Sequence, residues 1–116
     1  MIRKLVFLFT FMLVSFLLSA QSYKDDIFFQ AKQLFQNEKF GLSQQLYQKI
    51  YTDNFSSNQQ KEEALFHIAI CSKQLFNEDT KYWFDEFLNT YPYSSKTNAV
   101  NYELGLFYFR QVNYPF

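Results

Sequence analysis

The chain has 116 residues, 48% of them hydrophobic and 22% aromatic, so it can build a packed core and is not a disordered sequence. Eleven basic residues balance eleven acidic ones and lie scattered singly, which excludes the clustered positive charge that nucleic-acid binding requires. Two glycines and two prolines are too few for many β-turns or for a glycine-rich phosphate loop, and they favour long helices with short connections.

The first twenty residues have the layout of a secretory signal peptide. Arg3 and Lys4 give a positive start, and the uncharged run that follows, residues 5–18, is about fourteen residues long, too short for a spanning helix. We predict a signal peptide over residues 1–20, cleaved after Ala20, which would leave nine basic and eleven acidic side chains. An uncleaved signal anchor is the alternative, because Leu18 is larger than the small residue usual three positions before cleavage.

From Tyr23 onward apolar residues recur every three or four positions, which predicts a series of helices. Polar, turn-forming runs separate them at residues 37–39, 53–58 and 77–79, and Pro92 stops the fourth helix. Ser57 and Gln60 have the spacing of a capping box, so the third helix is expected to begin near Gln59. The predicted buried faces are, in chain order, Ile27, Ala31, Leu34 and Phe35; Phe40, Ser43, Tyr47, Ile50 and Tyr51; Leu65, Ile68, Ala69, Ser72 and Leu75 or Phe76; Thr80, Trp83, Phe84, Phe87 and Leu88; and Ala99, Tyr102, Leu104, Gly105, Tyr108 and Phe109.

Equivalent turn positions recur at a fixed interval. Phe40, Asn77 and Tyr114 are each 37 residues apart, an interval typical of helical repeat proteins. One helix hairpin cannot bury its own apolar face and must stack on a neighbour. We therefore predict an all-α solenoid of antiparallel helix hairpins over residues 21–116, with units at about 23–58 and 59–95 and a truncated unit at 96–116.

These residues resemble the tetratricopeptide repeat (TPR) family, in which a leucine–glycine pair is followed by an aromatic residue and, after the turn, by another. The third unit matches this pattern closely, through Leu104, Gly105, Tyr108 and Tyr114. The first unit matches more loosely, through Ala31, Leu34, Phe40, Ser43, Tyr47 and Ile50. In the second unit the small position falls on Ile68, or on Ala69 if the turn is one residue shorter, and we expect the shorter turn.

The run from Phe84 to Phe109 looks like an envelope branch of this family, which includes the outer-membrane assembly lipoprotein BamD and the periplasmic coordinator of the Tol-Pal system. The resemblance covers residues 23–116 and implies a right-handed α-solenoid whose first helices line a concave, protein-binding groove. The chain departs from the lipidated members of the branch, because no cysteine lies near the predicted cleavage point.

The resemblance also implies which residues face that groove. The candidate protein-binding residues are Phe28, Lys32, Gln36, Lys73, Tyr102, Phe109 and Arg110, with Phe35, Phe66, Ile70, Gln74 and Leu106 on the same faces. An apolar groove with interspersed cations would hold an extended peptide or a partner's helix. In the alternative interpretation the aromatic residues pack in the core and the cations are solvated.

No catalytic, cofactor-binding or metal site is predicted. His67 is the single histidine, and no cysteine or carboxylate cluster accompanies it at metal-ligand spacing. Cys71 follows four residues later, on the same helix face, but no third group orients the two as a catalytic pair. As the single cysteine, Cys71 cannot form an intramolecular disulfide and is expected to pack as a small apolar residue.

Together these features predict an exported TPR-like scaffold that binds a protein or peptide partner, needs no cofactor and is not an enzyme. Its expected location is the cell envelope of a Gram-negative bacterium, in the periplasm or at the outer membrane. The half-complete third unit predicts the N-terminal fragment of a longer repeat protein. Two alternatives stay open: a non-catalytic repeat domain of a larger envelope enzyme or sensor, and an inner-membrane-anchored assembly factor.

Overall fold

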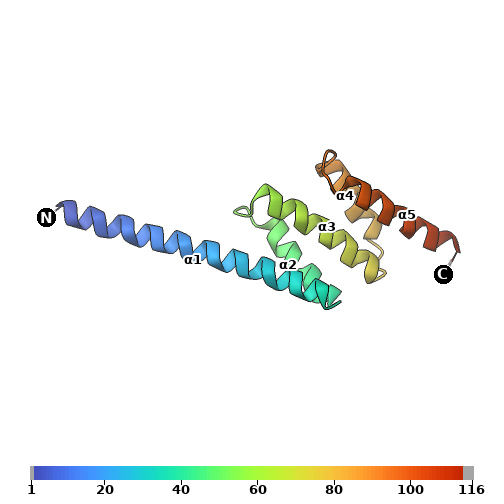
Figure 1. Cartoon of the computed structure of the whole chain (residues 1–116), viewed down its shortest axis with the longest axis horizontal. Coiled ribbons are helices and arrows are strands. Elements are labelled where there is room, and N and C mark those ends of the chain that lie inside the picture. The colour runs from blue at the N-terminus through green and yellow to red at the C-terminus, as the bar shows by residue number, and fades with distance from the viewer. Residues whose placement is uncertain (1, 114–116) are drawn as a thin grey trace.

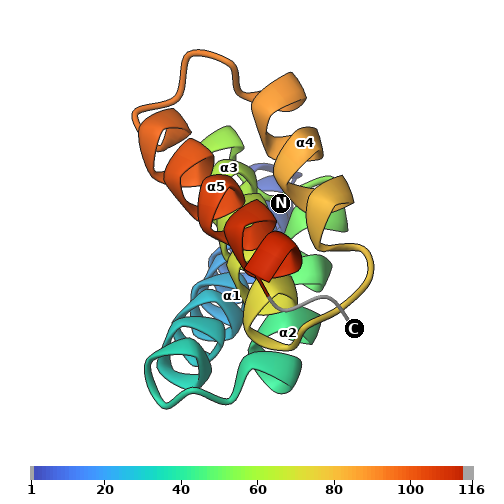
Figure 2. The ribbon, with the colours of Figure 1, turned by 90° about the vertical axis from the view of Figure 1, so that its right-hand side faces the viewer.

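The computed structural model describes residues 2–113, without the side chains of residues 18–25, and over that range the chain is all-helical. Its five helices are α1 (Ile2–Gln36), α2 (Phe40–Thr52), α3 (Asn58–Gln74), α4 (Thr80–Thr90) and α5 (Thr97–Asn113). Short connections fold each helix back onto the one before it, and α5 also contacts α3 (Figures 1 and 2). This confirms the predicted all-α class.

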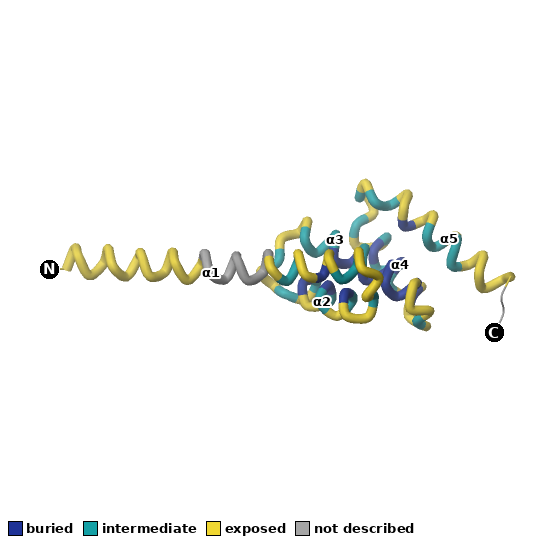
Figure 3. The backbone as a smooth tube through the Cα atoms, turned by 60° about the horizontal axis from the view of Figure 1, so that its bottom comes forward, coloured by how far each residue is buried: buried dark blue, intermediate teal, exposed yellow. Residues whose placement is uncertain are grey.

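The first helix is longer than the apolar spacing from Tyr23 predicts. It runs unbroken for 35 residues, because no glycine or proline interrupts the sequence between the apolar start and the first turn. The predicted boundary after Ala20 therefore lies inside α1, among residues whose side chains are outside the described part of the structure. Residues 2–17 are exposed, and α1 packs against α2 only near its C-terminal end (Figure 3).

Among the described residues, no helix combines the length and the apolar character that crossing a membrane requires.

The two hairpin turns close in the same way. Glu38 and Phe76 each adopt a left-handed backbone conformation, with φ values of 60° and 57°. The next residue in each turn donates its N–H five residues back, from Lys39 to Leu34 (2.8 Å) and from Asn77 to Ser72 (3.0 Å). This is the Schellman arrangement, which satisfies carbonyls that a helix end leaves open and reverses the chain. The turn between α1 and α2 and the turn between α3 and α4 therefore share one backbone geometry.

The start of α3 confirms the predicted capping box. The backbone N–H of Gln60 donates to the Ser57 hydroxyl (3.1 Å), and the N–H of Ser57 donates to the Gln60 side chain (3.0 Å). Two open N–H groups at the helix start are satisfied reciprocally, which fixes α3 at Asn58.

Two apolar clusters, with α3 between them, hold the hairpins together. The first core joins α1, α2 and α3 through Ala31, Tyr47, Ile50, Ala64 and Ile68. The second core joins α3, α4 and α5 through Leu65, Ala69, Ile70, Phe84, Phe87 and Val100.

The two cores also decide the register of the second unit. Ala69 packs with Phe84 and Phe87 of α4, whereas Ile68 belongs to the first core, as the shorter turn requires. The predicted burial of Leu75 or Phe76 is wrong: α3 ends at Gln74, so both residues enter the turn, with 39% and 78% of their surfaces exposed.

Side-chain hydrogen bonds tie the helices across both hairpins. The buried Ser43 hydroxyl donates to the carbonyl of Ala31 (2.8 Å), so α1 and α2 approach closely there. In the second hairpin Asp79 accepts from the Ser72 hydroxyl (2.6 Å) and from the indole N–H of Trp83 (2.9 Å). Trp83 itself packs against both cores, so this network joins the hairpins as well as the helices.

Tyr47 provides a test of what holds the first core together. Its ring is fully buried and stacks on His67, but its hydroxyl has no hydrogen-bond partner among the described residues. We expect Tyr47→Phe to leave the free energy of unfolding unchanged or to raise it by about 0.5–1 kcal/mol, because an unsatisfied buried hydroxyl is removed. Tyr47→Ala, the control, should cost about 3–5 kcal/mol through the cavity it leaves. Urea unfolding followed by circular dichroism measures both, and a large loss in Tyr47→Phe would contradict this account.

Candidate functional site

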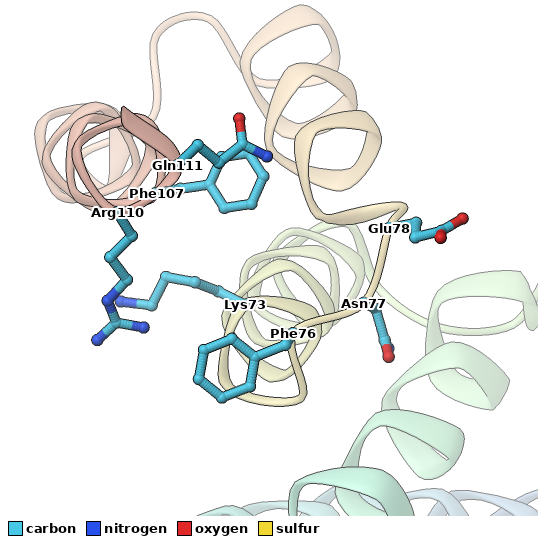
Figure 4. A pocket seen from close by; sticks show the side chains of 7 residues that line it. All are labelled: Lys73, Phe76, Asn77, Glu78, Phe107, Arg110 and Gln111. Carbon is cyan, nitrogen blue, oxygen red and sulfur yellow. The ribbon is translucent and has the colours of Figure 1, made fainter. Parts of the chain in front are cut away.

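A solvent-open cleft of about 430 Å³ lies where the C-terminal ends of α3 and α5 diverge (Figure 4). The C-terminal turn of α3 and the connection to α4 form one wall, and the last two turns of α5 form the other. The lining residues are Lys73, Phe76, Asn77, Glu78, Phe107, Arg110 and Gln111.

The cleft exists because of how the α3 end is built. Phe76 takes the left-handed position of the turn, which carries its side chain out of the second core and leaves its ring on the surface. Phe107 projects towards this region from α5, and Gln111 lies one turn further along the same helix. Two aromatic rings and two side-chain amides, those of Asn77 and Gln111, thus line one opening.

Charge is unevenly distributed around the cleft. Lys73, only 5% exposed, forms an ion pair with Glu103 of α5, so its charge is neutralised within the fold. The Arg110 guanidinium lies 5.9 Å from the centre of the Phe76 ring and pairs with no carboxylate among the described residues. The Glu78 side chain points away from these two cations (Figure 4). The end of the cleft at Arg110 is therefore aromatic and positively charged.

The structure brings only two of the seven candidate groove residues into this cleft, Lys73 and Arg110. Phe28 packs against Tyr47 in an edge-to-face contact (6.1 Å between ring centres) and supports the first core. Lys32 and Gln36 are exposed on α1. Tyr102 and Phe109 are 67% and 63% exposed on α5, but neither lines the cleft.

Sequence reasoning missed five lining residues: Phe76, Asn77, Glu78, Phe107 and Gln111. Phe107 lies three residues before Arg110, so helical spacing from Arg110 could have indicated it. Gln111 directly follows Arg110, so the same spacing does not indicate it. Phe76 could not be found this way, because its exposure follows from the left-handed turn and not from helical periodicity.

His67 and Cys71 do not form a reactive pair. His67 stacks on Tyr47 (4.6 Å between ring centres) and its Nδ1–H donates to the carbonyl of Glu63 (2.8 Å). Cys71 is fully buried, and desolvation raises the pKa of its thiol to about 11, which keeps it protonated at neutral pH. Among the described residues, no group of three or more histidine, cysteine, aspartate or glutamate side chains could hold a metal ion.

Searches of protein-family models, curated proteins and solved structures find no match to this chain.

His67 makes the stability of the first core depend on pH. Burial lowers the pKa of its imidazole below the usual 6.5, which outweighs the raising effect of Glu63; the charges of Lys96 and Lys32 lower it further. The unfolded chain therefore takes up the proton first, so stability present above pH 6.5 falls as the pH drops through 6.5 to the folded pKa. We expect wild-type protein to unfold at lower urea concentration at pH 5.5 than at pH 7.5.

The matched variant is His67→Phe, which keeps an aromatic ring in the stack and cannot titrate. Its urea midpoint should change less between pH 7.5 and pH 5.5 than that of the wild type. An equal change in the two proteins would show that other groups cause the pH dependence.

Proposed function

We propose that the chain is an exported helical-repeat scaffold that binds a protein partner and carries out no catalysis. The observation that carries the proposal is the cleft between the end of α3 and α5, where the exposed ring of Phe76, the partly buried ring of Phe107 and the unneutralised guanidinium of Arg110 lie together. Aromatic residues and arginine are the types most enriched where proteins bind each other.

The proposed architecture is a right-handed, TPR-like solenoid in which helix pairs stack on one another. Three observations support it: two turns of the same backbone geometry, small residues at Ala31 and Ala69 where each pair meets, and α3 shared between successive cores. In such stacks each unit contacts only its neighbours and presents an extended surface to partners. We propose the cleft as one part of that surface.

The proposed location is the envelope of a Gram-negative bacterium, reached through a signal peptide over residues 1–20. The charge pattern of Arg3 and Lys4 before an apolar run supports this. Among the α1 side chains that the structure describes, those that pack against the first core begin at Ile27, and cleavage after Ala20 would leave these contacts intact. Export and folding are therefore compatible.

Processing can be tested by expressing the chain in a Gram-negative host and measuring intact mass and location. We expect a mass that begins at Gln21, in the periplasmic or outer-membrane fraction. Leu13→Arg, which puts a charge into the middle of the apolar run and away from the cleavage point, should retain the full mass and accumulate in the cytoplasm. A wild-type mass that begins at Met1 in the inner-membrane fraction would instead support the anchored assembly factor.

The cleft predicts the kind of partner segment that binds there. An apolar side chain would lie against Phe76 and Phe107, and an adjacent carboxylate would pair with Arg110. Selection from a displayed random-peptide library should therefore enrich an aromatic or aliphatic residue next to aspartate or glutamate. We expect Arg110→Gln, which keeps a long polar side chain, to weaken the selected peptides by about 5- to 50-fold.

Lys39→Ala is the matched control, since this cation is exposed in the other hairpin turn and far from the cleft in sequence. It should leave the affinity within about twofold. Peptides that bind Arg110→Gln as well as wild type, or that enrich no acidic residue, would contradict the cleft as the binding site. Fluorescence anisotropy at two salt concentrations measures the affinities, and the Arg110 contribution should shrink at higher salt.

A further inference from the structure

Gly105 has no role in the described fold that requires glycine. It lies in the interior of α5, its φ is not positive, and a Cβ built on it would meet nothing within 4 Å. Glycine inside a helix is less stable than alanine, because it loses more backbone freedom on folding. Such a residue is useful where another backbone must approach closely, and within the described chain no backbone does so at Gly105.

The equivalent positions of the other two helices are both covered. Ala31 of α1 lies under α2, whose Ser43 hydroxyl reaches its carbonyl, and Ala69 of α3 lies under Phe84 and Phe87 of α4. α5 is placed like α3: Val100 and Leu104 pack on the second core as Ala64 and Ile68 pack on the first. The surface around Gly105 therefore continues the interface that joins α1 to α2 and α3 to α4.

This surface, which we call the open face, is formed by Tyr102, Gly105, Tyr108, Phe109 and Val112. Its large side chains are 67%, 42%, 63% and 79% exposed, in chain order. None of its own residues is charged, because the two charged residues of α5, Glu103 and Arg110, lie on the side that faces Lys73 and Phe76. Lys81 of α4, which is paired with Asp85, interacts with the Tyr108 hydroxyl at the edge of the open face. Aromatic residues without charges are typical of the centre of a protein interface.

The open face is complementary to itself. The helices that cover Ala31 and Ala69 present a small residue, a large ring four positions on and a large apolar residue three further on: Ser43, Tyr47 and Ile50 in α2, and Thr80, Phe84 and Phe87 in α4. α5 has the same series in Gly105, Phe109 and Val112. α5 thus has a small residue against which another helix can pack, as α1 and α3 have. It also has the series of residues with which α2 and α4 pack against such a small residue.

We infer that the open face binds a second copy of this chain, with two α5 helices crossing antiparallel at Gly105. A two-fold axis through that contact places Tyr102 of one copy opposite Tyr108 of the other, which is an isologous arrangement. One helix from each copy buries less surface than a stable interface usually does, so the dimer is reversible and concentration-dependent. The inference uses a different surface from the cleft and does not depend on the proposed function.

Cross-linking tests the crossing point directly. Gly105→Cys places two thiols at the two-fold axis, within reach of a disulfide, while the buried Cys71 stays unreactive. Gly41→Cys is the matched control, because Gly41 is also an exposed helical glycine with open space around its Cβ position. Under mild oxidation of the purified chain, we expect Gly105→Cys to form a covalent dimer at least about tenfold faster than Gly41→Cys.

Sedimentation velocity over a concentration series supplies an independent measurement. Gly105→Trp should raise the dissociation constant of the dimer at least about tenfold and leave the helix content of the chain unchanged. Gly41→Trp should have the dissociation constant of the wild type. Association through the exposed first half of α1 would cross-link both cysteine variants equally and would overturn the inference. So would a wild-type chain that stays monomeric, or a dimer that Gly105→Trp leaves intact.

Discussion

The fold depends on α3 being buried on two sides at once. Ala64 and Ile68 face the first core, whereas Leu65, Ala69 and Ile70 face the second. One hairpin alone would leave part of its apolar surface exposed to water. The two hairpins therefore stabilise each other, and α3 provides the contact between them. A change that unfolds α3 would therefore remove both cores together, and the capping box at Ser57, which fixes where α3 starts, contributes to the whole stack.

Much of this architecture could be predicted from local signals. The spacing of Ser57 and Gln60 and the polar breaks between helices act through neighbours close in sequence, so they could be predicted. Ala69 packs with Phe84 and Phe87 of the next helix, and it was indicated by comparing the repeat units instead. The helical spacing was predicted only from Tyr23 onward, whereas α1 extends back to Ile2 through a segment that contains no glycine or proline. The predicted buried face of α5 was wrong at Ala99, Tyr102, Gly105, Tyr108 and Phe109, which are exposed, and Val100, the buried residue of that helix, was missed.

The candidate site was less predictable, for two physical reasons. The spacing predicted Leu75 or Phe76 on the buried face of the third helix, whereas the left-handed backbone at Phe76 puts its ring on the surface. Lys73 was predicted to line a protein-binding groove, with a solvated surface position as the alternative. It is instead buried and paired with Glu103, 30 residues away on α5, a contact that helical periodicity does not reveal. Removing Glu103 would leave the buried Lys73 ammonium unpaired, which is strongly destabilising. The ion pair therefore favours the position of α5 beside α3 that the structure shows.

Trp83 gives the molecule an internal optical probe. It is the single tryptophan of the chain, its ring contacts both cores and its indole N–H is bound to Asp79. Emission from that ring depends on the polarity around it, so loosening of either core would change the same signal. One measurement of Trp83 emission during unfolding therefore reports on both hairpins. The change in emission would have two steps only if the hairpins unfolded separately.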